Sequence, residues 1–180
     1  MKKISIDQHT HHLHAEVRQL YESAFPKEEQ IPFDELLELL QKMPISFEAY
    51  YEDDTFIGLT IVLRRADFNW FWYFAVNPDK RGCGYGQQIL QSLIKQYAYQ
   101  PLILDIELPT QAGCPNAGQR QRRYAFYLRN GFRDTHTGKS FEGIDYTILM
   151  HGDGVFTQAD YDQIIHDLRA CWQHCPDEDN

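Results

Sequence analysis

An apolar segment that leads into a glycine-rich turn restricts the fold of this 180-residue chain more than any other feature. In residues 68–76 nearly every side chain is apolar, at odd and at even positions alike. Because side chains alternate between the two faces of a strand, this pattern predicts a central strand covered on both sides. Apolar residues at helical spacing follow in residues 84–97. The turn therefore joins a buried strand to a helix.

The other segments predict a mixed-sheet α/β domain. In chain order we expect a strand at 3–7, helices at 12–24 and 33–42, strands at 46–51, 55–64 and 68–76, a helix at 84–97, a strand at 102–107, a helix at 119–129, a strand or loop region, a strand near 146–150 and a helix near 158–174. Helices, then antiparallel strands, then alternating strands and helices are typical of such a domain. We expect one domain over residues 1–176, with its core at 5–150 and a disordered acidic tail at 177–180.

Composition and charge exclude several classes of partner. The chain is 43% hydrophobic and 14% aromatic, as soluble globular proteins are. It has no apolar run of the roughly 18 residues that span a bilayer and no apolar region of a signal peptide near its start, so we expect a cytoplasmic protein with no membrane partner. The net charge of −9 argues against nucleic acid, which requires a basic face. It suits a cationic acceptor such as an amine, and equally simple solubility.

The cysteines and histidines do not predict a metal site. The sequence contains four cysteines and no secretion signal, which favours free thiols. Cys171, His174 and Cys175 form one cluster, but no second pair of ligands accompanies it. Four histidines, at positions 9, 11, 12 and 14, form another cluster that is more typical of a polar helix start. We therefore expect no metal.

The glycine-rich turn has the features of an anion-binding site. Gly82, Gly84 and Gly86 stand at alternate positions, where they allow a tight turn that exposes several N–H groups. The helix that follows adds the positive end of its dipole. Lys80 and Arg81 add full positive charges. The turn therefore suits a phosphate or pyrophosphate, with an ordinary strand-to-helix turn as the alternative.

Two other phosphate-binding motifs fit the sequence less well. A dinucleotide fingerprint requires a third glycine where this chain has Gln87. The sequence GKS at residues 138–140 looks like the end of a P-loop, but Arg133 stands where that motif requires a glycine. A nucleotide-binding regulator is therefore only a third alternative.

Two segments together resemble the signatures of the GNAT N-acetyltransferase superfamily. The sequence VNPDKRGCGYG, from Val76 to Gly86, is similar to the coenzyme A signature of that superfamily. The sequence FYLRNGF, from Phe126 to Phe132, is similar to its second signature, a helix that ends in tyrosine before a Gly-Phe pair. Their spacing matches too, and the resemblance covers most of residues 5–150. It implies a mixed, mostly antiparallel central sheet flanked by helices, with a splayed central strand pair.

The resemblance implies acetyl-CoA as the co-substrate and assigns residues to it. The main chain of Phe74, Ala75 and Val76 would bind the pantetheine arm and polarise the thioester carbonyl. The turn would bind the pyrophosphate through a contiguous set of residues: Arg81, Gly82, Cys83, Gly84, Tyr85, Gly86 and Gln87. These assignments come from the family signature, and they agree with the anion-binding features of the turn itself.

The helix before Tyr127 departs from the common family pattern. Arg120 and Arg123 stand where many members carry asparagine and alanine, and residues 119–133 contain five arginines and no acidic residue. Arg120, Arg123 and Tyr127 share one helical face. We expect one of these two arginines, Arg123 in our assignment, to contact a cofactor phosphate or a substrate carboxylate. A solvated basic face is the alternative.

The resemblance also implies that an amine attacks the thioester directly. Tyr127 matches the family tyrosine that protonates the departing thiolate, and a phenol with a pKa of about 10 is reasonably matched to a thiol with a pKa of about 8.5. Glu107 is our candidate base, acting through water. Asp105 shares its strand face, and two neighbouring carboxylates raise one pKa. The alternative role of the two acids is to bind a cationic substrate or a nearby arginine.

These observations predict an N-acetyltransferase that moves an acetyl group from acetyl-CoA to a primary amine of a small molecule or peptide. The alternative is a catalytically silent module that binds coenzyme A as a regulator or interaction partner. The loops at 25–33 and 108–118 would select the acceptor, but they contain no specific motif. A homodimer is compatible with the sequence.

Overall fold

The computed structural model describes residues 1–111 and 113–172, with side chains up to Ala170. The chain divides into two compact units, Met1–Leu104 and Asp105–Asn180. One strand, β5 (Leu102–Glu107), begins in the first unit and ends in the second. The predicted tail and the last two residues of the helix expected near 158–174 lie outside the described residues.

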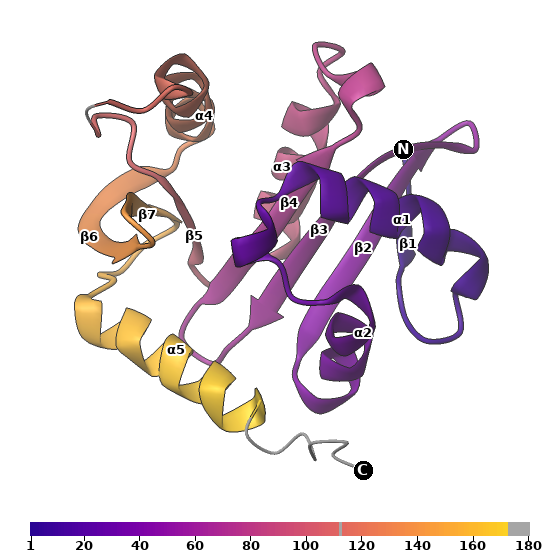
Figure 1. Cartoon of the computed structure of the whole chain (residues 1–180), viewed down its shortest axis with the longest axis horizontal. Helices are drawn as coiled ribbons and strands as arrows, with labels where there is room; N and C mark the ends of the chain where they lie inside the picture. Colours follow the sequence, from indigo (N-terminus) through magenta and orange to yellow (C-terminus); the bar gives the residue numbers. More distant parts are fainter. Residues whose placement is uncertain (112, 173–180) are drawn as a thin grey trace. The chain divides into compact units, whose positions relative to one another are not determined.

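The first unit is a sheet with helices on both faces. Its elements are β1 (Lys2–Ser5), α1 (His11–Ala24), a 3-10 turn η1 (Lys27–Glu29), α2 (Phe33–Lys42), β2 (Ile45–Glu52), β3 (Thr55–Arg64), β4 (Asn69–Val76), a second 3-10 turn η2 (Pro78–Lys80), α3 (Tyr85–Gln96) and the start of β5. The strand order is β1-β2-β3-β4-β5, antiparallel up to β4 and parallel from β4 to β5. In Figure 1, α1 and α2 lie on one face of these strands and α3 on the other.

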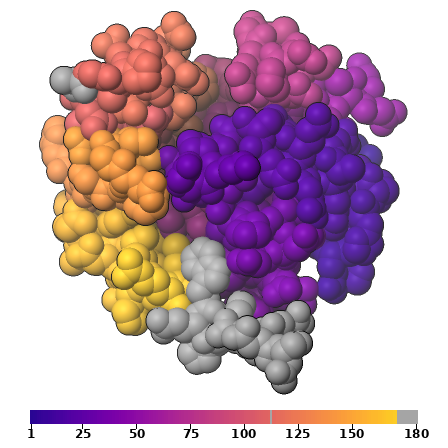
Figure 2. All heavy atoms as spheres, viewed as in Figure 1, coloured from indigo at the N-terminus to yellow at the C-terminus, as the bar shows by residue number. Residues whose placement is uncertain are grey.

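The helices of this unit form where apolar residues recur at helical spacing. In α1 the buried residues include Leu13, Val17 and Leu20, and α2 has the bounds that its pattern predicted. In the space-filling view, indigo atoms of the N-terminal part of the chain form much of the visible face of the first unit, and purple and magenta atoms of its later residues lie beside them (Figure 2). The predicted helical periodicity is therefore confirmed as the face that packs on the sheet.

A β-bulge interrupts β4 at Trp72. Phe71 pairs with Val62 of β3, and Tyr73 pairs with Ile61, so two neighbouring residues of β3 face three residues of β4. Such an extra residue bends a strand and increases its local twist. The alternation of side chains predicted for residues 68–76 therefore does not run unbroken along β4.

The two faces of β4 differ beyond the bulge. Tyr73 and Ala75 are buried, whereas Trp72, Phe74 and Val76 are only half-buried. The expectation of a strand covered on both faces was therefore wrong for this second half. The apolar residues on the less covered face lie just before the glycine turn, where the sequence places the pantetheine arm.

The strands β4 and β5 separate soon after they begin. Within residues 1–111 and 113–172, the pairs that join them are Asn69 with Leu102 and Trp70 with Ile103. From Phe71 to Val76, the ladder partners of β4 belong to β3. This confirms the mixed, mostly antiparallel sheet flanked by helices and its splayed strand pair.

The second unit contains the end of β5, α4 (Ala117–Arg129), β6 (Arg133–Phe141), β7 (Ile144–His151) and α5 (Gln158–Trp172). Its strand order is β5-β7-β6, and β6 and β7 form an antiparallel hairpin. The sequence left β6 as a strand or loop region, because it is polar and lies at the edge of the sheet. Its register shifts between Asp134 and Gly138, where His136 has a left-handed backbone with φ of 59°.

The first unit buries several tyrosine hydroxyl groups. Tyr50 is almost fully buried, and its hydroxyl lies 3.1 Å from that of Thr60. Burial raises the pKa of Tyr50 to about 12. Burial also raises the pKa of Tyr21 and of Tyr97. The folded protein therefore accommodates these side chains as neutral phenols.

We expect the free energy of unfolding to fall as the pH rises above about 10. A tyrosine in the unfolded chain titrates near pH 10, whereas folded Tyr50 keeps its proton until about pH 12. Its stabilising contribution is therefore complete below about pH 10 and is lost as the pH rises toward 12. Urea titrations near pH 8 and near pH 11 measure this loss. Tyr50→Phe should lose less stability than the wild type over that interval, and equal losses would contradict the assignment.

Candidate active site

The glycine turn is an exposed connection between β4 and α3. Residues 81–84 are exposed, and Tyr85 and Gly86 are half-buried. Gly82 and Gly84 have φ of 77° and 83°, in the left-handed region that strains other residues. A Cβ atom added to either glycine would meet no atom within 4 Å. These two glycines are therefore required by the backbone conformation and not by crowding, and the space above them is open.

The helix α3 begins at this turn without a capping side chain. Gly84 is its N-cap residue, so no side chain accepts a hydrogen bond from the first turn. The first N–H groups of a helix have no carbonyl partner within the helix, and they combine with its dipole to attract anions. Arg81 lies beside them, with its Nε donating to the carbonyl oxygen of Val76 at 3.2 Å. The guanidinium group of Arg81 is thus held between the end of β4 and the start of α3.

A glycine in β3 fixes the position of the end of β4. Gly58 pairs with Val76, and a Cβ atom on Gly58 would lie 2.4 Å from the carbonyl oxygen of Ala75. Only glycine allows the two backbones to approach this closely. The main chain of Phe74, Ala75 and Val76, which the sequence assigns to the pantetheine arm, is therefore set by contact with β3.

The loop between α1 and α2, which we expect to select the acceptor, is held by two tyrosines. The hydroxyl of Tyr21 donates to the carbonyl of Ile31 at 3.1 Å and accepts from the Ile31 N–H at 3.0 Å. The hydroxyl of Tyr73, on β4, donates to the carbonyl of Glu29 at 2.5 Å. The ring of Tyr73 also packs edge to face on Tyr21 and Phe25, with centroids 5.1 and 4.9 Å away. The loop is therefore fixed to α1 and β4.

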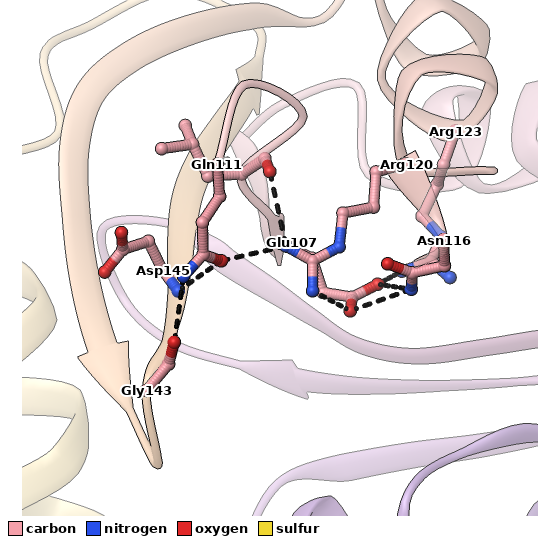
Figure 3. Close-up of polar contacts among 8 residues, drawn as sticks. Glu107, Gln111, Asn116, Arg120, Arg123, Gly143 and Asp145 are labelled. Carbon is pink, nitrogen blue, oxygen red and sulfur yellow. Dashed lines mark hydrogen bonds and ion pairs between the residues drawn. The ribbon is translucent and has the colours of Figure 1, made fainter. Parts of the chain in front are cut away.

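In the second unit, Glu107 is the centre of a polar cluster (Figure 3). Its Oε1 lies 2.8 Å from Nη2 of Arg120, and its Oε2 lies 3.1 Å from Nη1 of Arg123. The amide of Asn116 donates to both oxygens, at 3.2 and 3.4 Å. Only 14% of the Glu107 side chain is exposed. The sequence left two roles open for Glu107, and these contacts favour the binding of arginine over the role of base.

Arg120 is buried, and its guanidinium group contacts other residues of the protein. It is 4% exposed, and its Nη1 donates to Oε1 of Gln111 at 2.9 Å and to the carbonyl of Leu108 at 3.5 Å. Gln111 in turn accepts from the Asp145 N–H at 3.1 Å and donates to the carbonyl of Gly143 at 2.8 Å (Figure 3). Arg120 therefore joins α4 to the loop after β5 and to the β6–β7 turn.

Arg123 and Tyr127 lie one turn apart on α4. The Arg123 side chain is 39% exposed, although Glu107 holds one end of it. Tyr127 is 7% exposed, and its ring packs edge to face on Phe132 with centroids 5.4 Å apart. Burial raises the pKa of Tyr127 above its usual range, Arg123 lowers it and Asp105 raises it. The residue that the sequence predicts as the proton donor is thus a neutral phenol at physiological pH.

Asp105, the second carboxylate of β5, forms an ion pair with Lys139 of β6. Nζ of Lys139 lies 2.6 Å from its Oδ2, and lies over the rings of Tyr146 and Tyr161 at 4.7 and 5.5 Å from their centroids. Burial disfavours the charged amine, but the carboxylate of Asp105 outweighs this and raises the pKa of Lys139. Sequence reasoning missed this pair, because Lys139 belongs to β6 and no local pattern connects it with β5.

The described residues contain neither a metal cluster nor a membrane span. Within residues 1–111 and 113–172, no group of three or more histidine, cysteine or acidic side chains could hold a metal ion. No helix of that part of the chain has both the length and the apolar character needed to cross a membrane. Cys83 and Cys114 are free thiols. The candidate cluster of Cys171, His174 and Cys175 lies outside the described side chains.

One known protein family matches a segment of this chain that begins in the first unit and ends in the second. The model of the acetyltransferase (GNAT) domain family matches residues 46–134, which include β4, the glycine turn, Glu107 and Tyr127. This segment of the chain belongs to the GNAT superfamily. A comparison with curated proteins finds no match.

Solved structures share the fold of this GNAT protein. A GNAT-family protein from Bacteroides thetaiotaomicron is 24% identical, with a TM-score of 0.77 over 94% of this chain and 97% of its own. The aminoglycoside 6'-N-acetyltransferase from Enterococcus faecium is 13% identical, with a TM-score of 0.61 over 84% and 96%. An acetyltransferase from Bacillus subtilis, crystallised with CoA, is 15% identical, with a TM-score of 0.60 over 85% and 99%. Likeness at these identities establishes the fold.

Replacement of the glycine in β3 tests whether its contact sets the end of β4. We expect Gly58→Ala to destabilise the GNAT protein by about 1–3 kcal/mol, because the added methyl group forces the two strands apart. Coenzyme A affinity should fall as well, since the Ala75 carbonyl moves. Urea denaturation and titration calorimetry measure the two effects.

The matched control for this change is Gly118→Ala in α4. Its added Cβ would come no closer than 4.0 Å to Nη1 of Arg122, and alanine favours a helix. It should therefore leave stability and coenzyme A affinity near wild-type values. Normal affinity in Gly58→Ala would show that the cofactor does not depend on this part of β4.

Removal of the Glu107 charge tests its role as the partner of two arginines. We expect Glu107→Gln to destabilise the protein by about 3–5 kcal/mol, because buried Arg120 loses its counter-charge. The control is Glu142→Gln at the exposed β6–β7 turn, which should cost less than about 0.5 kcal/mol. A Glu107→Gln variant with wild-type stability and greatly reduced turnover would instead support the role of base.

Proposed function

We propose that this GNAT protein transfers an acetyl group from acetyl-CoA to a primary amine of a small molecule or peptide. The observation that carries the proposal is the exposed turn at the end of a splayed strand, with two left-handed glycines and an uncapped helix start. A pyrophosphate is the kind of anion that such a turn binds. The related structures from Bacillus subtilis and from Elizabethkingia anophelis contain CoA and acetyl-CoA respectively, which supports the same ligand here.

The proposal divides the cofactor between two parts of the first unit. The pyrophosphate would lie on the turn, against a set that consists of Arg81, Gly82, Cys83, Gly84, Tyr85, Gly86 and Gln87. The pantetheine arm would lie along the end of β4, where Phe74, Ala75 and Val76 offer main-chain groups and half-buried apolar side chains. For Arg123, 39% exposed, the sequence leaves a cofactor phosphate and a substrate carboxylate as alternative contacts, and steady-state kinetics of Arg123 variants decide between these and other roles. The silent coenzyme A-binding module would use the same residues, so turnover separates the two functions.

The reaction forms one C–N bond and breaks one C–S bond. A neutral amine attacks the thioester carbonyl, the carbonyl oxygen becomes negative for a moment, and the thiolate of coenzyme A leaves. We assign the protonation of that thiolate to Tyr127, whose buried phenol carries a proton at neutral pH. The attacking amine gives its proton to water, because the carboxylate oxygens of Glu107 already accept from Arg120, Arg123 and Asn116.

Incubation with acetyl-CoA and a panel of primary amines tests the proposed activity. Free coenzyme A should appear together with acetylated amine. Both products should be separated by chromatography, because exposed Cys83 would itself react with a thiol reagent. Binding of coenzyme A without turnover of any amine would favour the silent module. Thermal stabilisation by ATP or NAD but not by coenzyme A would favour a nucleotide-binding regulator.

Replacement of the proposed proton donor gives a sharper expectation. Tyr127→Phe should lower kcat by about 100-fold, because the thiolate then leaves without a general acid. The affinity for coenzyme A, measured by calorimetry, should stay near the wild-type value. The control Tyr124→Phe removes a hydroxyl from the same helix, one that donates to Asp134 at 3.2 Å, and should keep most of the activity. Full activity in Tyr127→Phe would remove Tyr127 from the mechanism.

A further inference from the structure

The ionised side chains near Tyr127 form two groups with different net charge. In one group, Asp105 and Lys139 form an ion pair, with Oδ2 and Nζ 2.6 Å apart. In the other group, one carboxylate among the described residues, Glu107, contacts the guanidinium groups of both Arg120 and Arg123. Arginine keeps its charge at any physiological pH, so this second group carries a surplus of positive charge.

The surplus charge lies mainly on Arg123. Arg120 is buried, and it has the shorter contact with Glu107, 2.8 Å against 3.1 Å for Arg123. Arg123 is bound to Glu107 through Nη1, and 39% of its side chain is exposed. It precedes Tyr127 by four residues, so the two side chains are neighbours on one face of α4. An oriented, incompletely neutralised guanidinium group therefore lies beside the proposed proton donor.

We propose that Arg123 acts through Tyr127, by stabilising the phenolate that remains when Tyr127 gives its proton to the coenzyme A thiolate. The inference rests on the proposed function. When the C–S bond breaks, the thiolate takes the phenol proton, and the negative charge moves to the Tyr127 oxygen until water returns a proton. A buried phenolate without a nearby cation would be costly. Glu107 holds the guanidinium in place. Asp105, which acts against Arg123 on Tyr127, is itself paired with Lys139.

The electrostatic surroundings of Tyr127 are consistent with this role. Burial raises the pKa of Tyr127, Arg123 lowers it, and Asp105 raises it. Arg123 thus counteracts the burial that keeps the proton on the phenol. Without Arg123, proton transfer to the thiolate would be less favourable, whereas binding of acetyl-CoA would not change.

A phosphate contact by Arg123 predicts different kinetics. If Arg123 bound a phosphate of acetyl-CoA in both the ground state and the transition state, its loss would raise KM and leave kcat unchanged. If it acts through Tyr127, its loss lowers kcat and leaves KM for acetyl-CoA unchanged. The two roles are therefore separable in a single steady-state experiment.

The test compares Arg123→Gln, Arg123→Lys and the control Arg122→Gln in the full-length protein. We expect Arg123→Gln to lower kcat by about tenfold, which corresponds to a loss of about one pKa unit in the driving force for proton transfer from Tyr127 to the thiolate. KM for acetyl-CoA should stay within about twofold of the wild-type value. Arg123→Lys should recover most of kcat, because it restores the charge. Arg122→Gln removes the same charge from an exposed neighbour and should have little effect. Melting temperatures identify any variant whose loss reflects unfolding.

A second arm places Arg123→Gln in the Tyr127→Phe background. Because no phenolate forms there, Arg123→Gln should cause no further loss of kcat. If the double variant instead lost kcat by the product of the two single-variant losses, the inference would be overturned. A raised KM for acetyl-CoA at unchanged kcat in Arg123→Gln would also overturn it, and would assign Arg123 to a cofactor phosphate. A wild-type protein that acetylates no amine would instead refute the proposed function, before any variant is compared.

Discussion

The separation of β4 from β5 is the constraint on which the cofactor half of the site depends. After Trp70 the ladder partners of β4 belong to β3, and Gly58 allows the β3 backbone to approach Ala75 closely enough to hold it. A strand paired on one side can offer main-chain groups on the other, and here it does so just before an exposed turn. The bulge at Trp72 bends the strand at the point where its pairing becomes one-sided.

In the second unit, charged side chains of β5, α4 and β6 lie where they are partly or fully shielded from water. Among the described residues, Glu107 of β5 contacts Arg120 and Arg123, and Asp105 of the same strand contacts Lys139. Buried ion pairs contribute little net stability, because desolvation offsets their attraction. Such a cluster is therefore better explained by the geometry and the charge that it imposes on α4 than by stability alone. An acidic protein thus keeps two ion-paired arginines on the helix that carries one buried tyrosine.

Local sequence patterns were sufficient for most of the elements, though not for β6, and for the turn. The bounds of α2 and β5 were predicted because they depend on short apolar patterns, and the glycine turn was found because its conformation requires glycine. The bulge at Trp72 was not predicted, because it is defined by register with another strand. The pairing of Lys139 with Asp105 was missed for a similar reason, since the side chain of one strand reaches another strand far away in sequence. The partners of Glu107 were anticipated only as one of two alternatives, because the arginine-rich helix showed the cations but not which acid they meet.

Because the loop between α1 and α2 is held by side-chain contacts, its rigidity would affect how an acceptor binds. Tyr21 and Tyr73 already fix this loop through their hydroxyls and rings, so it loses little further conformational entropy when a ligand binds beside it. An acceptor would then meet a surface whose shape is set in advance, and it would be accepted or rejected by fit. Its association would be governed by diffusion and by the attraction of a cation to an acidic protein, with no slow loop closure before the chemistry.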